Sequence, residues 1–251
     1  MKKPEVSVVV FDYGNTLILD PFEKVMKLKA NDFERILKGN GYDVGKEEIV
    51  DSWRKANKNI NYPFCSHFYQ EIPIVKNALE RFGIPRKDRN RLANELLVAY
   101  REGLEIVLKK DRRIERVKEI LRELKRRGKR LMVLTNDRTD GTRSVFSWTG
   151  LDKFFEKIII SETLGMEKPD PRIFKYMVKI AGVDKEEIVY VGDDPERDIK
   201  PSKKLGIRTI LLKNPESLSV SKWRNYRFRL KAREKPDFVV RDLGEILDLI
   251  R

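Results

Sequence analysis

The sequence contains little of what several classes of protein require. Its 251 residues include one cysteine, Cys65, which excludes an internal disulfide. No run of apolar residues approaches the roughly 20 that are needed to cross a membrane. The opening Met-Lys-Lys-Pro leads into an apolar run that is too short for the core of a signal peptide. We therefore expect a soluble, cytoplasmic protein without a membrane partner.

Charged residues make up 37% of the chain, and the formal net charge is +14. A mixture rich in lysine, arginine and glutamate is common in proteins from hot environments, where networks of ion pairs gain value. A basic balance also suits anionic partners such as phosphorylated metabolites, nucleotides or nucleic acids. A thermophilic, solvated surface explains most of these charges, so composition alone indicates no particular partner.

The most informative stretch is residues 6–20, VSVVVFDYGNTLILD. Its first six residues are almost all apolar and β-branched, which predicts a strand buried on both faces, as in a parallel sheet under helices. The strand ends at Asp12, and the pair Gly14-Asn15 that follows favours a tight turn. A carboxylate at the carboxyl end of a central strand lies where α/β sheets place their active sites. From this stretch alone, Asp12 is equally well explained as the end of a strand.

Three later stretches favour the interpretation of Asp12 as an active-site residue. Residues 131–136, LMVLTN, predict a second apolar strand that ends at Thr135. Residues 165–171, GMEKPDP, place Lys168 before a proline-marked helix start. Residues 188–198, IVYVGDDPERD, predict a third strand that runs into acidic residues. These motifs, in this order and after suitable strands or helix starts, resemble the haloacid dehalogenase superfamily of phosphatases and phosphotransferases.

The resemblance implies a role for each motif. Asp12 is expected to be the nucleophile, which attacks phosphorus and forms an aspartyl-phosphate. Thr135 and Lys168 are expected to act with it, the hydroxyl by binding a phosphate oxygen and the ammonium by its charge. By itself, Thr135 is also an ordinary hydroxyl at a strand end. The residues expected to bind the small phosphorylated substrate are Asn15, Thr16, Thr135, Asn136 and Lys168.

Two anions approach each other only if positive charge is present, and the resemblance implies that Mg²⁺ supplies it. Its expected ligands are the side chains of Asp12 and Asp193 and the backbone carbonyl of Gly14, since Mg²⁺ prefers oxygen. Asp194 and Asp198 are expected to support the site from nearby. The alternative is that these three late acids match the positive end of a helix start.

Position 14 departs from the family's pattern. Phosphatases of this superfamily usually carry a second Asp two residues after the nucleophile, as general acid and base, and this chain has Gly14 there. The missing proton-transfer group predicts weak activity toward poor leaving groups. His67 and Asp137 are the first candidates for a substitute. The imidazole of His67 titrates near neutrality, as a general acid requires. A lone helix histidine is more often a surface or packing residue.

Between the first two motifs the pattern is helical, with helices predicted over residues 22–39, 47–58, 66–82 and 86–109. From Ile114 onward, strands alternate with helices, which predicts a mainly parallel, doubly wound sheet. We therefore predict an α/β fold with a Rossmann-like sheet core over residues 1–19 and 111–251. An all-helical cap is expected over residues 20–110, and the resemblance implies that it closes over substrate.

Residues 222–235 contain seven basic residues and one acid, with three aromatic residues among them. From Arg227 the basic residues alternate, which places them on one face of an extended segment. This composition allows nucleic-acid binding. A solvated edge ribbon, whose charges prevent aggregation, is the commoner use of such a segment. We expect no specific nucleic-acid partner, and the oligomeric state stays unknown.

These observations together predict a cytoplasmic, Mg²⁺-dependent phosphatase that hydrolyses a small phosphorylated metabolite through an aspartyl-phosphate. A first alternative is a 2-haloacid dehalogenase, whose aspartate attacks carbon without a metal. Asp193 and Asp194 oppose it, because an acidic site without a bound cation repels the carboxylate of a haloacid. A second alternative is a catalytically weak binding protein, which Gly14 and the basic segment support. No motif names the substrate.

Overall fold

A computed structural model of the chain describes residues 5–61, 71–215 and 234–250. The chain divides into two compact units. The sheet unit comprises Met1–Asp20 and Asp111–Arg251, and the helical unit comprises Pro21–Lys110. His67 and most of the basic segment 222–235 lie outside the described residues, so the expectations for them stay predictions.

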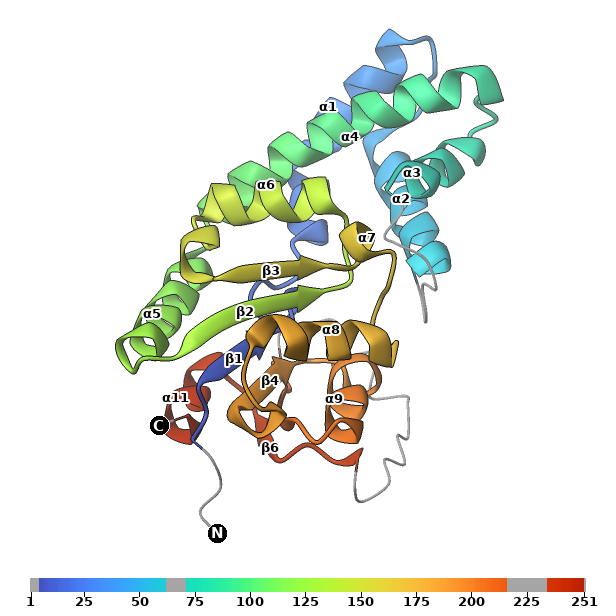
Figure 1. The fold of residues 1–251 in the computed structure, drawn as a ribbon. Helices are drawn as coiled ribbons and strands as arrows, with labels where there is room; N and C mark the ends of the chain where they lie inside the picture. The colour runs from blue at the N-terminus through green and yellow to red at the C-terminus, as the bar shows by residue number, and fades with distance from the viewer. Residues whose placement is uncertain (1–4, 62–70, 216–233, 251) are drawn as a thin grey trace. The chain divides into compact units, whose positions relative to one another are not determined.

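The sheet unit contains six strands in the order β3-β2-β1-β4-β5-β6, and every neighbouring pair is parallel (Figure 1). The chain leaves β1 to form β2 and β3 on one side and then returns to form β4 on the other side. The order of strands therefore reverses between β1 and β4, where α/β sheets bind their ligands. The predicted doubly wound, parallel α/β fold is confirmed. The strands are β1 (Val8–Phe11), β2 (Arg130–Thr135), β3 (Lys157–Ile160), β4 (Ile188–Gly192), β5 (Arg208–Leu212) and β6 (Phe238–Val240).

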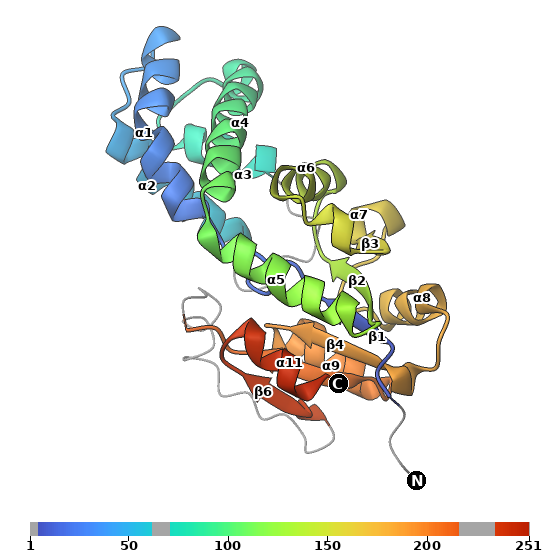
Figure 2. The same cartoon turned by 90° about the vertical axis from the view of Figure 1, so that its left-hand side faces the viewer.

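Helices cover both faces of this sheet, which explains why its central strands are apolar at nearly every position. One set of alternate strand residues, including Val10 and Leu134, packs on α8 (Pro171–Ala181). On the opposite side α5 (Arg112–Arg126) contacts β2 and α11 (Ile246–Leu249), as Figure 2 shows.

In the described part of the sheet unit, the other α-helices are α6 (Thr139–Thr149), α7 (Ser161–Leu164) and α9 (Lys200–Lys204). The segment that follows β4 is divided into a π-helical turn, Pro195–Ile199, and α9. The backbone N–H groups of Asp198 and Ile199 both donate to the carbonyl of Asp194, at 2.9 and 3.2 Å, which widens the turn. Pro201 has no N–H to donate to the preceding turn, so a regular α-helix cannot run through it.

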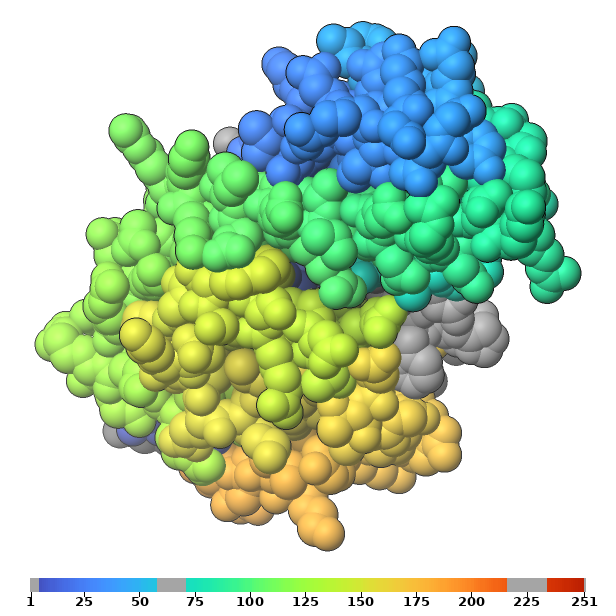
Figure 3. Space-filling model, turned by 90° about the horizontal axis from the view of Figure 1, so that it is seen from above, coloured from blue at the N-terminus to red at the C-terminus, as the bar shows by residue number. Residues whose placement is uncertain are grey.

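The helical unit consists of α1 (Phe22–Gly39), α2 (Lys46–Asn61), α3 (Glu71–Glu80) and α4 (Arg86–Lys109). It has a core of its own, in which the ring of Trp53 lies 5.2 Å from that of Phe33 and 5.5 Å from that of Tyr100. Figure 3 shows α4, in green, against α1, in blue. Over the described parts of both units, none of the helices combines the length and the apolar character needed to cross a membrane.

Candidate active site

Asp12 follows β1 directly and is 7% exposed. Its backbone N–H donates to the carbonyl of Val191 on β4, at 2.8 Å, which extends the pairing of the two strands by one residue. Phe11 pairs with both Val133 and Val191, so the carboxyl ends of three strands meet around Asp12. A buried carboxylate is costly unless it has partners, and a residue that merely ends a strand does not need to be buried.

The turn after β1 folds back toward Asp12. The carbonyl of Tyr13 accepts the backbone N–H groups of Thr16, Leu17 and Ile18, at 3.4, 2.9 and 3.2 Å. This turn directs the hydroxyl of Thr16 to Asp12, where it donates to Oδ2 at 3.3 Å. Thr16 therefore contacts the carboxylate of the expected nucleophile.

The left-handed residue of this turn is Asn15, with φ 57°, and not the glycine before it. The Asn15 side chain accepts the backbone N–H of Asp20 at 3.4 Å, so its amide oxygen stabilises the turn. An added Cβ on Gly14 would meet no atom within 4 Å. Position 14 thus has room for a side chain and needs no glycine for its backbone conformation.

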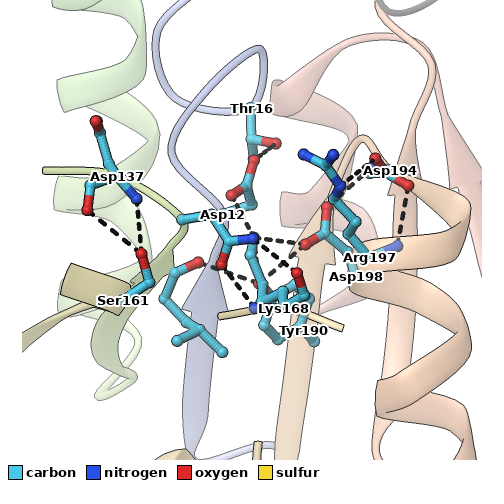
Figure 4. A network of polar contacts seen from close by, with 11 residues as sticks. Asp12, Thr16, Asp137, Ser161, Lys168, Tyr190, Asp194, Arg197 and Asp198 are labelled. Carbon is cyan, nitrogen blue, oxygen red and sulfur yellow. Dashed lines mark hydrogen bonds and ion pairs between the residues drawn. The ribbon is translucent and has the colours of Figure 1, made fainter. Parts of the chain in front are cut away.

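Lys168 lies at the centre of the site, with only 3% of its side chain exposed. Its Nζ donates to Oδ1 of Asp12 at 2.6 Å and to Oδ1 of Asp198 at 2.7 Å (Figure 4). A third contact joins it to the hydroxyl of Tyr190 at 3.2 Å. Lys168, which lies between the second and fourth motifs in the sequence, therefore contacts Asp12 of the first motif and Asp198 of the fourth.

The backbone of Lys168 is held by Asn136. The Asn136 amide donates to the carbonyl of Lys168 and accepts its N–H, both at 2.7 Å. Asn136 was expected to bind substrate, and here its amide engages the lysine. Thr135, which ends β2, is 2% exposed, one residue beyond the level of Asp12. Asp137, two residues after Thr135, begins the approach to α6 and accepts the N–H of Arg138 at 2.7 Å.

The acidic residues after β4 divide into two kinds. Asp194 caps the π-helical turn by accepting the N–H groups of Glu196 and Arg197, at 2.8 and 3.0 Å. This is the helix-start role that the alternative interpretation proposed for such acids. Asp198 is 1% exposed and accepts from Lys168 and from the N–H of Asp194, the latter at 3.0 Å.

Gly192 makes room for Asp198. An added Cβ at position 192 would lie 2.5 Å from Oδ2 of Asp198, closer than real contacts allow. The carboxylate therefore packs directly on the backbone of the last strand residue. This is the physical reason why a glycine ends β4.

Burial and ion pairing set the charges of the site. Burial raises the pKa of Asp12 to about 6, and the charge of Lys168 opposes this rise. Burial also disfavours the charged form of Lys168, but the charges of Asp12 and Asp198 outweigh it and raise the pKa of Lys168 well above its ordinary value. At neutral pH the nucleophile candidate is a carboxylate beside an ammonium.

Three buried carboxylates lie close together at this site. Asp12, Asp193 and Asp198 each offer an oxygen, and these oxygens lie within 4.8 Å of one another. All three residues are buried, at 7%, 8% and 1% exposed. The excess negative charge and the all-oxygen donor set fit a hard divalent cation such as Mg²⁺.

Of the residues expected at the site, the structure brings together Asp12, Thr16, Lys168, Asp193 and Asp198. Asn15 and Asp194 instead stabilise turns around them. Sequence reasoning missed Tyr190, because a tyrosine inside an apolar strand resembles any other core aromatic. The only signal was its place three residues before Asp193 on a strand that ends in a motif.

Comparisons with known proteins agree with this arrangement. The model of the haloacid dehalogenase-like hydrolases matches residues 73–212. A glyceraldehyde 3-phosphate phosphatase of Methanocaldococcus jannaschii is 35% identical over 244 residues, which cover 97% of this chain and 96% of that protein.

Among solved structures, the magnesium-bound YfnB of Bacillus subtilis has a TM-score of 0.68 at 19% identity and covers 99% of this chain and 100% of its own. A 2-haloacid dehalogenase of Pseudomonas syringae has a TM-score of 0.64 at 22% identity, with 97% of both chains covered. At these identities the two structures show the shared fold and nothing about the reaction.

A parallel sheet with a buried carboxylate and lysine beside its central strand defines an α/β enzyme whose chemistry lies at the carboxyl edge of that sheet. The chain belongs to the haloacid dehalogenase-like hydrolases, and it is a phosphatase-like member of that family. The resemblance that the four motifs carried is confirmed.

Proposed function

We propose that this chain is a Mg²⁺-dependent phosphatase that hydrolyses a small phosphorylated metabolite through an aspartyl-phosphate at Asp12. The buried ion pair between Lys168 and Asp12, at 2.6 Å, carries the proposal. It keeps a carboxylate ionised and oriented at the edge of the sheet where substrates bind. Similarity to a named phosphatase over nearly the whole chain supports phosphorus, and not carbon, as the atom attacked.

The reaction has two steps at Asp12. In the first, a carboxylate oxygen bonds to phosphorus while the bond from phosphorus to the leaving oxygen breaks. In the second, a water oxygen bonds to phosphorus and Asp12 leaves as a carboxylate. Lys168 and Thr16 hold opposite oxygens of this carboxylate, at 2.6 and 3.3 Å, and so limit its rotation. Thr135 is assigned to a phosphate oxygen, because it ends the neighbouring strand.

The metal assignment follows the carboxylates. Asp12 and Asp193, with the carbonyl of Gly14, are assigned to hold Mg²⁺, and Asp198 supports Asp12 through Lys168. When bound, the ion neutralises the negative charge that the nucleophile and the phosphoryl group bring together. The helical unit is assigned the role of a cap that closes over substrate, as mobile lids do.

We expect hydrolysis of 4-nitrophenyl phosphate to require Mg²⁺, to stop in EDTA, and to recover when Mg²⁺ is restored.

Asp12→Asn should lower kcat by several orders of magnitude, because an amide is a poor nucleophile. Asp152→Asn, which changes an exposed carboxylate of the same unit, is the matched control and should keep full activity. Phosphate release is the measurement, and circular dichroism verifies that each variant is folded.

Full activity in EDTA would reject the metal, and Asp12→Asn activity within about tenfold of the original would reject the nucleophile. Halide release from 2-haloacids would favour the dehalogenase instead. A panel of phosphorylated metabolites should include glyceraldehyde 3-phosphate, the substrate in the name of the relative. Turnover of none of them, with Mg²⁺ present, would favour the weak binding protein.

A further inference from the structure

Among the described residues Tyr190 has the largest fully buried side chain, and its hydroxyl is the one polar atom of that side chain. It lies on β4 within the cluster that covers α8, and its ring centre is 5.7 Å from that of Phe174. A phenylalanine would fill the same space. The hydroxyl is therefore the part of this residue that packing does not explain.

That hydroxyl lies among three polar groups. It is 3.2 Å from Nζ of Lys168, 3.2 Å from the carbonyl of Leu134 and 3.2 Å from Oδ1 of Asp198 (Figure 4). A phenol has one hydrogen, which it donates to one of the two oxygens, and its own oxygen accepts from the ammonium in either case. Burial, and then the charge of Asp198, raises the pKa of Tyr190 well above its ordinary value, so the group stays a neutral hydroxyl.

The contacts of Lys168 match its hydrogens in number. A lysine ammonium has three N–H groups, and Asp12, Asp198 and Tyr190 supply one acceptor each, at 2.6, 2.7 and 3.2 Å. With all three engaged, the ammonium cannot rotate without breaking a hydrogen bond in a buried site. Its charge is thereby fixed beside Oδ1 of Asp12, which the backbone clamp of Asn136 alone does not ensure.

We propose that Tyr190 is a positioning residue, whose hydroxyl holds the ammonium of Lys168 against the nucleophile. The inference rests on the proposed function of Asp12 and extends it: Lys168 acts on the nucleophile, and its third N–H is given to Tyr190, not to the substrate. Loss of the hydroxyl therefore affects the chemical step more than the binding of substrate.

The test is Tyr190→Phe, which keeps the ring and removes the oxygen. We expect kcat to fall by roughly 10- to 100-fold, because small misplacements of catalytic groups have effects of that size, while KM changes by less than about twofold. Tyr176→Phe is the matched control, since it makes the same substitution on α8 beside the same cluster. It should leave both constants unchanged. Thermal unfolding is measured for each variant, so that activity is compared per folded molecule.

Two results would overturn the proposal. If Tyr190→Phe lowers the melting temperature but keeps kcat, the hydroxyl has only a structural role. If KM falls severalfold while kcat holds, the hydroxyl competes with substrate for the third N–H of Lys168. Asp12→Asn, assayed in parallel, distinguishes a failure of the proposed function from a failure of the role proposed for Tyr190. An active Asp12→Asn enzyme rejects the proposed function, whereas an inactive one beside a fully active Tyr190→Phe enzyme rejects only the role of Tyr190.

Discussion

Position 14 carries the chain's main departure from the usual family pattern, and the structure shows what that departure leaves open. A glycine in a turn often holds a backbone conformation unsuited to a side chain. The structure places the left-handed conformation at Asn15, and an added Cβ on Gly14 would meet nothing within 4 Å. Position 14 therefore lacks a proton donor but has the space and the backbone conformation to accept a side chain that carries one.

We predict that Gly14→Asp raises turnover of alkyl phosphates more than that of aryl phosphates. General acid catalysis typically supplies about 10²- to 10⁴-fold, and an alkoxide leaving group needs a proton far more than a nitrophenolate does. The measurement is kcat/KM for one substrate of each kind. Gly14→Asn is the control, because it adds a side chain of the same size without an acid. A native enzyme that is equally fast on both substrates would mean that another group, with Asp137 the first to test, already supplies the proton.

Asn136, which the sequence predicts to bind substrate, has its amide engaged by the backbone of another site residue. Both atoms of its amide are hydrogen-bonded to the backbone of Lys168, at 2.7 Å. We predict that Asn136→Ala lowers kcat while KM changes little, and destabilises the fold by roughly 1–3 kcal/mol, because partly buried groups lose their partners. Steady-state kinetics and urea unfolding measure the two effects. A rise in KM at constant kcat would instead support the expected role in substrate binding.

At the scale of elements, the end of α5 is joined to the C-terminal helix by charged side chains. Arg127 donates to the carbonyls of Leu247 and Ile250, the latter at 2.9 Å, and also to Glu123 at 2.7 Å. Hydrogen bonds from Arg126 and Arg127 lower the pKa of Glu123 from 4.5 to about 2. The last turn of α5 thus holds α11 through an arginine that Glu123 orients.

This shift predicts a pH dependence of stability. The pKa of Glu123 is lower in the folded state, so its contribution is complete above about 4.5 and is lost as pH falls through about 2. Glu123→Gln should lack that contribution, and the stability difference from the native chain should narrow as the pH is lowered. Urea midpoints between pH 7 and pH 3 measure it, with Glu119→Gln, an exposed glutamate of the same helix, as control. A constant difference across this range would contradict the role of Glu123.

At the scale of the whole molecule, two units each contain an apolar core. The helical unit, Pro21–Lys110, buries large side chains from all four of its helices, among them Phe33, Ile49, Leu79 and Leu92. A contiguous segment with its own core has what independent folding requires. The net charge of +14, to which the basic segment 222–235 contributes seven basic residues and one acid, suits anionic substrates without naming one.

We predict that residues 21–110, expressed alone, fold into a helical domain with a cooperative thermal transition. Leu92→Ala in this fragment should destabilise it by about 2–5 kcal/mol, because it opens a cavity in the core. Circular dichroism in the far and near ultraviolet measures both. A fragment with helical signal but no cooperative transition would show that the helical unit depends on the sheet unit for its packing.

The sequence alone determined the strands, their order of appearance and the motifs at their ends. Residues 86–109 are a helix with the bounds that the pattern predicted, and β2 ends at Thr135, where the pattern placed its end. Apolar, β-branched runs and helical periodicity are local signals, and a parallel sheet buried on both faces makes them strong. Asp12 was found in the same way, because it lies beside such a signal, whereas Lys168 was found through the resemblance of its motif to the family's pattern.

Only the tertiary structure decided which polar atoms share a partner. Asn136 reaches Lys168 across 32 residues of sequence, and Tyr190 reaches it across 22. Both contacts depend on the register of β2 and β4 with β1 and on where α8 lies against the sheet. A hydrogen bond requires distances correct to a few tenths of an ångström. Local sequence preferences do not fix distances that finely between segments far apart in the chain, whereas the packing of a complete sheet does.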